Sequence, residues 1–176
     1  MIAHLRGKLI HKQPGQAIIE AGGVGYDVTI SVPTFTGLPV AGAETSLHIY
    51  TQVSEDQIAL FGFQDREEKR LFERLWDNTR YFQGELRGAG FNVGGINTPA
   101  TETPITPVIL GEGRTAMDFS RALFEEGVMG TGIAFPTVPE GKARIRLILT
   151  SEHTRAQLDQ ALETLERVAK RMRILS

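Results

Sequence analysis

Two arginines at alternate positions, Arg144 and Arg146, form the pattern that is best suited to binding a small anion. They lie in an apolar run, residues 143–149, which predicts a β-strand. Alternation along a strand puts both side chains on the face opposite Ile145. A guanidinium can make two parallel hydrogen bonds to one carboxylate, so this face could recognise a substrate carboxylate. On spacing alone, two ion-paired surface arginines are the more common explanation.

Two adjacent carboxylates, Glu55 and Asp56, are the second candidate. They stand between two apolar runs, residues 47–53 and 57–63, and therefore at the tip of a predicted β-hairpin. Such a pair repels phosphate and could act as an acidic pin that pushes nucleic-acid backbones apart. A solvated turn is the more common explanation of the same two residues.

Other catalytic and metal-binding patterns are missing from the sequence. The four histidines, His4, His11, His48 and His153, do not stand at metal-ligand spacing from one another or from a carboxylate, and so predict no metal site. No cysteine is present, which excludes disulfides and thiolate chemistry. The glycine-rich residues 22–25 are not followed by a helical pattern, so they predict a β-turn and not a phosphate loop.

The first 63 residues consist of short β-type runs separated by turn signals. Residues 26–32 show the pattern best, because Tyr26, Val28, Ile30 and Val32 alternate with polar residues. Five strands in so short a stretch favour a closed or partly closed barrel, since closure removes exposed strand edges. The predicted strands are residues 5–10, 17–21, 26–32, 47–53 and 57–63.

The remainder has helical periodicity interrupted by strands. A helix is predicted from Arg66, capped by residues 64–65 and stopped by residues 88–90, before a loop over 92–106. The order of elements then favours a two-layer α/β domain with helices on a mostly antiparallel sheet. The expected elements are a strand over 105–110, a helix over 115–126, strands over 128–135 and 143–149, and a helix over 154–172.

The bulk composition sets outer limits on function. A formal net charge of -2 gives no overall field that would attract nucleic acid or an anionic membrane. No apolar run approaches the roughly 20 residues that span a bilayer. The N-terminus shows no signal peptide. These observations favour a cytoplasmic protein without a membrane partner.

The first part of the chain resembles the N-terminal domain of the RuvA family, which binds Holliday junctions in the bacterial branch-migration machine. The resemblance implies an OB-fold barrel that helps to build a tetramer, with Glu55 and Asp56 at the positions of the acidic pin. The stretches that carry it are 1–3 (MIA), 5–7 (LRG), 22–26 (GGVGY), 38–39 (LP), 54–56 (SED), 60–63 (LFGF) and 67–72 (EEKRLF).

The family continues into paired helix-hairpin-helix motifs that grip phosphates, and this sequence contains neither of them. An acidic pin without these phosphate-binding motifs would repel DNA. Together with the net charge of -2, this argues against binding of a four-way junction in the manner of the family.

The second part resembles the C-terminal domain of 2-amino-3-ketobutyrate CoA ligase and related α-oxoamine synthases. In that family the second arginine of the GKARIR motif binds the substrate carboxylate, which points to Arg146. The stretches that carry the resemblance are 75–82 (LWDNTRYF), 101–108 (TETPITPV), 123–128 (LFEEGV), 132–139 (GIAFPTVP), 141–146 (GKARIR) and 153–154 (HT).

The enzymes of that family use pyridoxal phosphate, which they hold on a lysine in a large upstream domain. The RuvA-like part stands at that place in this chain. We therefore expect no catalytic residue, no cofactor and no bound metal. The two parts meet near residues 73–75, so they cover about 1–74 and 75–176. The predicted domains are a barrel over 1–63, a shared connecting helix over 64–90 and an α/β domain over 91–176.

Three functions remain open at this point. The leading hypothesis is a non-catalytic chimera, engineered or recombined, whose uncovered apolar faces promote self-association. The second is a residual Holliday-junction-binding and oligomerisation module. The third is a fragment of a pyridoxal-phosphate-dependent acyltransferase of the glycine C-acetyltransferase type that still binds a ligand.

Overall fold

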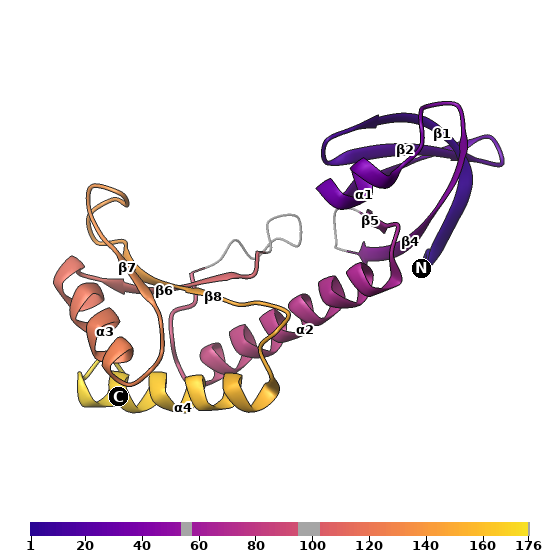
Figure 1. Ribbon diagram of the computed structural model, residues 1–176. Helices are drawn as coiled ribbons and strands as arrows, with labels where there is room; N and C mark the ends of the chain where they lie inside the picture. The colour runs from indigo at the N-terminus through magenta and orange to yellow at the C-terminus, as the bar shows by residue number, and fades with distance from the viewer. Residues whose placement is uncertain (54–57, 95–102, 176) are drawn as a thin grey trace. The chain divides into compact units, whose positions relative to one another are not determined.

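The computed structural model describes residues 1–53, 58–94 and 103–175. The chain divides into two compact units, the first comprising Met1–Glu73 and the second the described residues from Arg74 onward (Figure 1). Each unit has its own cluster of buried apolar side chains, and the two clusters share no residue. Within the described ranges, no helix is both long and apolar enough to cross a membrane.

The first unit is the closed five-stranded barrel that the sequence predicts, with the strands in the order β1-β2-β3-β5-β4. Neighbouring strands are antiparallel except β3 and β5, which are parallel. The parallel pairing was not predicted, because it depends on which strands meet when the sheet closes. The strands are β1 (His4–Gln13), β2 (Gln16–Ala21), β3 (Val24–Ile30), β4 (Glu44–Val53) and β5 (Ile58–Phe63).

The barrel interior is filled by one face of each strand, as period-two alternation requires. Two glycines mark where backbone and side chains approach most closely. A Cβ on Gly7 would lie 2.0 Å from the carbonyl oxygen of Glu20, and one on Gly62 would lie 2.6 Å from Cγ1 of Val28. The fully buried aliphatic residues of this core are Leu9, Ala17, Ile19, Val28, Leu47 and Ile49.

A short helix, α1 (Val32–Gly37), replaces the end of the third predicted strand. The prediction that Val32 continues the buried face of β3 is therefore wrong, and this side chain is 69% exposed. Ser31 ends the strand because its hydroxyl accepts a hydrogen bond from the amide of Thr34 at 3.1 Å, which caps the helix. Pro33, in the first turn, has the φ that a helix start needs.

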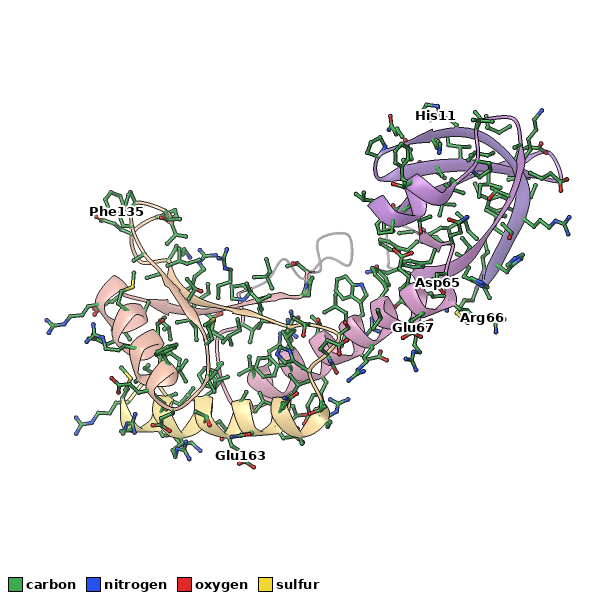
Figure 2. All side chains as sticks on the ribbon, viewed as in Figure 1. His11, Asp65, Arg66, Glu67, Phe135 and Glu163 are labelled. Atoms are coloured by element: carbon green, nitrogen blue, oxygen red, sulfur yellow. The ribbon has the colours of Figure 1, made fainter. Side chains whose placement is uncertain are left out.

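Helix α2 (Arg66–Gly88) begins where the sequence predicts. Asp65 lies at its N-terminus (Figure 2) and accepts a hydrogen bond from the amide of Glu67 at 2.9 Å, as an N-cap does. The first turns belong to the barrel unit, where Phe72 packs on Phe63 with ring centroids 5.1 Å apart. The later turns belong to the second unit. Gly90 follows the helix with a positive φ of 93°, a conformation that suits glycine.

The second unit contains a three-stranded antiparallel sheet in the order β6-β8-β7. Helices pack against it, which confirms the predicted two-layer α/β arrangement (Figure 1). Glu163 points away from the sheet on the outer face of the last helix (Figure 2). The elements are β6 (Ile105–Gly111), α3 (Gly113–Glu125), β7 (Thr131–Ile133), β8 (Ala143–Ile148) and α4 (Arg155–Arg171).

Strand β7 is much shorter than the predicted strand over 128–135. Before its start, the hydroxyl of Ser120 donates a hydrogen bond to the carbonyl of Gly130, which ties this part of the chain to α3. At its end, the carbonyl of Ala134 accepts a hydrogen bond from the amide of Thr137 at 3.0 Å and closes a turn. Only Thr131–Ile133 therefore pair with β8.

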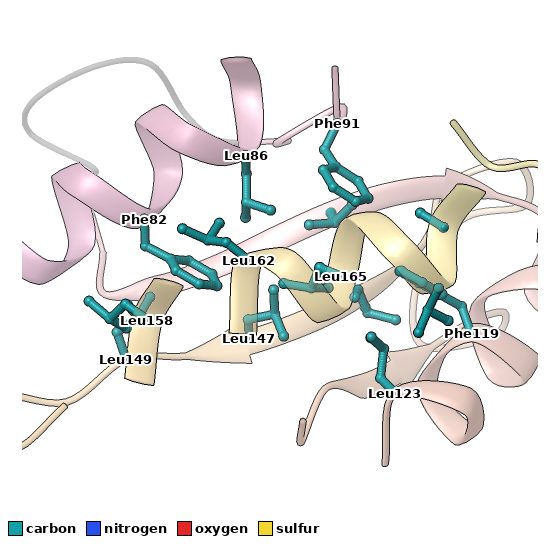
Figure 3. Close-up of a cluster of buried hydrophobic side chains, with 14 residues drawn as sticks. Phe82, Leu86, Phe91, Phe119, Leu123, Leu147, Leu149, Leu158, Leu162 and Leu165 are labelled. Atoms are coloured by element: carbon teal, nitrogen blue, oxygen red, sulfur yellow. The ribbon is translucent and has the colours of Figure 1, made fainter. Parts of the chain in front are cut away.

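The core of the second unit lies between the sheet and helices α2, α3 and α4 (Figure 3). Burial of apolar surface stabilises such a core by about 25 cal/mol per Å². The largest fully buried side chains come from α3, β8, α4 and α2. They include Phe119, Leu123, Ile145, Leu165 and Leu86.

Candidate functional site

The arginine pair lies on the face of β8 that the sequence predicts. Ala143, Ile145 and Leu147 are buried beneath the helices, whereas Arg146 is exposed and Arg144 half-buried on the opposite face. Arg146 stands directly across from Pro107 of β6 and from Thr131 of β7, the first residue of that strand. The guanidinium of Arg146 is thus carried by the central strand of the sheet.

Arg146 lines an open hollow of about 550 Å³, which we call the Arg146 hollow. The hollow exists because β7 begins only at Thr131, so β8 has no paired neighbour on that side beyond Arg146. It is lined by Phe82, Glu126, Gly127, Val128, Met129, Thr131, Arg146, Leu147, Ile148, Leu149, Thr150, His153, Gln157, Leu158, Gln160 and Ala161.

The backbone of Ile148 faces this open side. The amide of Leu149 donates a hydrogen bond to the carbonyl of Pro104 at 3.3 Å, so the backbone of Leu149 points towards β6. Residues of a strand alternate between its two neighbours, so the amide and carbonyl of Ile148 point the other way, towards the hollow. The side chains of Met129 and Ile148 are 77% and 55% exposed, and they make the rim of the hollow apolar.

The charges around the hollow favour an anion. Glu126 is the acidic residue among the lining side chains, and it is held by Arg167 and by Arg171, the latter at 2.7 Å. The hydrogen bond from Arg167 lowers the pKa of Glu126, and Arg171 adds to this effect. Among the residues that the structure describes, no carboxylate forms a salt bridge with Arg146.

A buried amide holds the turn that forms one wall of the hollow. Asn78 of α2, only 6% exposed, donates hydrogen bonds to the carbonyls of Thr150 at 3.1 Å and of His153 at 2.9 Å. Nδ1 of His153 accepts a hydrogen bond from the amide of Thr150 at 3.1 Å. Sequence reasoning missed Asn78, although a polar residue inside the apolar stripe of a helix is a signal that could have found it.

Glu55 and Asp56 lie outside the described residues, so their place at a hairpin tip stays a prediction. His153 lines the hollow. In the part of the chain that the structure describes, no group of three or more histidine, cysteine, aspartate or glutamate side chains could hold a metal ion.

Comparison with known proteins identifies the first unit. Residues 1–62 match the RuvA N terminal domain. The Holliday junction branch migration complex subunit RuvA of Acidobacterium capsulatum is 80% identical over 75 residues, which cover 43% of this chain and 38% of that protein. The predicted resemblance of the N-terminal part is confirmed.

Residues 43–165 match the aminotransferase class I and II family. The 8-amino-7-oxononanoate synthase/2-amino-3-ketobutyrate coenzyme A ligase of Thermus thermophilus is 52% identical over 111 residues, or 63% of this chain and 27% of that protein. The 8-amino-7-oxononanoate synthase of Thermoanaerobacter pseudethanolicus is 43% identical over 140 residues, or 80% of this chain and 31% of that protein. The chain thus spans about a third of the length of these relatives.

Solved structures agree with this second match. A high-resolution structure of SPT with a PLP internal aldimine superposes with a TM-score of 0.56 and 28% identity, over 64% of this chain and 27% of that chain. Serine palmitoyltransferase of Sphingomonas wittichii gives a TM-score of 0.54 and 27% identity, over 59% of this chain and 25% of that chain.

The two family matches overlap at residues 43–62. The structure places most of this overlap in β4 and β5 of the closed barrel, and so in the RuvA-like unit. The predicted chimera of two unrelated parts is confirmed. An N-terminal RuvA domain is joined to a C-terminal part similar to 8-amino-7-oxononanoate synthase, through which the chain belongs to the aminotransferase class I and II family.

Proposed function

We propose that this chain does not catalyse the reactions of its C-terminal relatives and that its Arg146 hollow binds small carboxylates. One observation carries the proposal, which is the set of side chains around Arg146. They offer a cation without a salt bridge to any described carboxylate, an apolar rim at Met129 and Ile148, and no lysine.

The residues of this hollow do not fit pyridoxal phosphate. Enzymes that use this cofactor hold it as a Schiff base on a lysine amine. From Arg74 onward the sequence has two lysines, Lys142 and Lys170, and neither lines the hollow. Lys142 precedes β8, and Lys170 on α4 pairs with Glu166 at 3.4 Å.

The expected ligand is a short apolar carboxylate. Arg146 can donate a fork of two hydrogen bonds to the carboxylate, while Met129 and Ile148 contact the hydrocarbon chain. Because the guanidinium is open to solvent, the ion pair contributes only about 0–1 kcal/mol, so binding is expected to be weak.

NMR titration with butanoate, and with butanamide as its neutral analogue, tests this binding directly. Amide shifts at β8 and the turn after it should move with butanoate and stay in place with butanamide. Arg146→Gln should abolish the shifts, and Arg144→Gln is the matched control that should keep them. Equal responses to the two ligands would rule out carboxylate recognition by Arg146.

A second titration tests the absence of cofactor chemistry. The protein is mixed with pyridoxal phosphate, the Schiff-base absorbance is followed, and the adduct is reduced with borohydride and weighed by mass spectrometry. We expect scattered, unsaturable labelling of surface lysines. A one-equivalent adduct that disappears in Lys142→Arg or Lys170→Arg alone would contradict the proposal.

A residual junction-binding function is the second candidate, and the 80% identity to a RuvA subunit favours it. The test is a fluorescence titration of a labelled four-way DNA junction at low and at moderate salt. The double variant Glu55→Gln/Asp56→Asn serves as a parallel sample for the proposed acidic pin. Tight, salt-sensitive and junction-selective binding would support this candidate, whereas weak binding that ignores junction shape would remove it.

Self-association belongs to the same proposal. The resemblance of the barrel to the RuvA family implies an oligomer. The second unit also exposes three large apolar side chains, those of Phe124, Met129 and Ile148. Sedimentation velocity over a range of concentrations should show a species larger than a monomer.

We also propose the division into a barrel over 1–63, a connecting helix over 64–90 and an α/β domain over 91–176. The end of β5 at Phe63 and of α2 at Gly88 supports these bounds.

A further inference from the structure

Two histidines face each other across neighbouring strands of the barrel. In the pairing of β1 with β4, His4 stands directly opposite His48. Next to them along the ladder, the amide of Ile49 donates a hydrogen bond to the carbonyl of Ala3 at 2.9 Å, so Ala3 and Ile49 form a hydrogen-bonded pair. Pairs alternate along an antiparallel ladder, which makes the two histidines a non-hydrogen-bonded pair, the arrangement in which opposite side chains come closest.

The two imidazole rings lie close together, and neither is hydrogen-bonded to a described residue. Their ring centroids are 6.0 Å apart with an interplanar angle of 63°. Neither ring of the pair has a hydrogen-bond partner among the described residues, in contrast to His153, whose ring accepts from a backbone amide. His4 is exposed and His48 half-buried, so solvent and a dissolved ion can reach the pair.

The surroundings leave room for a cation. Arg6, the nearest cation along the same face of β1, is paired with Glu44 at 3.4 Å, which offsets its charge. On the other side, His48 stands opposite Phe63, which is buried and whose ring packs on Phe72.

From this geometry we propose that His4 and His48 bind one late first-row transition-metal ion, with water in its remaining coordination positions. Imidazole nitrogen binds Cu²⁺, Ni²⁺ and Zn²⁺ well. Metal–nitrogen bonds of about 2.0 Å bring two ligating nitrogens to roughly 3.3 Å from each other. Rotation of the exposed His4 side chain between staggered rotamers closes the remaining distance. The bound ion would tie the start of β1 to β4.

Titration of the protein with CuCl₂, NiCl₂ or ZnCl₂ by calorimetry tests the site. We expect one equivalent to bind, most tightly for Cu²⁺ in accordance with the general order of divalent ions. Electron paramagnetic resonance of the Cu²⁺ complex should show coupling to two nitrogens. The melting temperature of the barrel should rise with metal concentration, because the ion binds the folded state.

Variants separate this site from others. His4→Gln and His48→Gln should each weaken binding by about tenfold or more, since loss of even an outer contact to a ligand costs this much. His11→Gln, another exposed histidine on β1, is the matched control and should bind like the wild type. Binding that survives His48→Gln and vanishes in His4→Gln would assign the ion to His4 and the terminal amino group and overturn the proposal. So would the absence of saturable binding. His4 is exposed, so its variant stays informative even if His48→Gln folds poorly.

Discussion

The two units of this chain differ in whether their sheets have edge strands. Every strand of the barrel has a neighbour on both sides, since β1 and β4 close the sheet. The sheet of the second unit has three strands, and its edge strand β7 pairs over only three residues. The closed sheet completes its own core, whereas the open one leaves part of β8 and the side chains around Arg146 uncovered.

This difference explains where a ligand can bind. In the barrel the inward side chains fill the interior, and close contacts at Gly7 and Gly62 leave no space for a further atom. In the second unit the short edge strand exposes the backbone of Ile148 and opens the hollow beside Arg146. The incomplete sheet edge thus makes a hollow that reaches the backbone of the sheet, whereas a ligand of the barrel would have to bind on its outer surface.

The largest effect should come from removing the ring at the centre of the second core. Phe119→Ala should lower the free energy of unfolding of that unit by about 3–5 kcal/mol, because a large buried side chain leaves a cavity. Denaturant unfolding followed by fluorescence of Trp76, the single tryptophan, reports on this unit. Ile49→Ala in the barrel core is the comparison, and it should leave the Trp76 transition in place.

The tight packing of the barrel predicts a second effect. Gly7→Ala should destabilise the barrel by about 1–3 kcal/mol or more, because its Cβ would collide with the backbone oxygen of Glu20. Gly25→Ala, whose Cβ would have its nearest neighbour at 3.6 Å, should leave stability unchanged or raise it slightly. Circular dichroism during thermal unfolding measures both. Equal effects of the two substitutions would show that the interior is not closely packed at Gly7.

The wall of the Arg146 hollow should be more tolerant. Asn78→Ala should cost about 1–3 kcal/mol in the second unit, because it removes the donors to two backbone carbonyls. It should also reduce the NMR response to butanoate, since the turn after β8 loses its anchor. Asp77→Ala, which removes only an exposed ion pair with Arg80, should change neither stability nor binding appreciably. An Asn78 variant with normal stability would show that the anchor is dispensable.

The smallest effect concerns pH. The hydrogen bond from Arg167, and then that from Arg171, lowers the pKa of Glu126 in the folded state. A lowered folded pKa means that the unfolded chain binds the proton more readily. The contribution to stability is therefore present above the unfolded pKa and is lost as pH falls through the folded pKa. Thermal unfolding from about pH 7 to about pH 3 should show a weaker acid dependence in Glu126→Gln than in the wild type.

Much of the architecture follows from local patterns in the sequence. Alternation predicted the barrel strands, and it placed Arg144 and Arg146 on the face away from Ile145, as the structure shows. The same rule failed at Val32, where alternation continued but the Ser31 cap and Pro33 start a helix. Local chemistry of that kind overrides periodicity.

Other features depend on contacts that no local pattern encodes. Strand β7 covers only part of the apolar run over 128–135, and its shortness leaves the edge of β8 beyond Arg146 unpaired beside the hollow. His4 lies opposite His48 because of the register between β1 and β4, two strands that are far apart in the sequence. The role of Glu55 and Asp56 stays a prediction, since both lie outside the described residues.

Hydrogen exchange followed by mass spectrometry of Ile49→Ala and Phe119→Ala is the most direct test of two separately built units. Each variant should lose amide protection only in peptides of its own unit, Met1–Glu73 for Ile49→Ala and the residues from Arg74 onward for Phe119→Ala. Loss of protection throughout the chain in both variants would contradict this account, because the two cores would then fold as one.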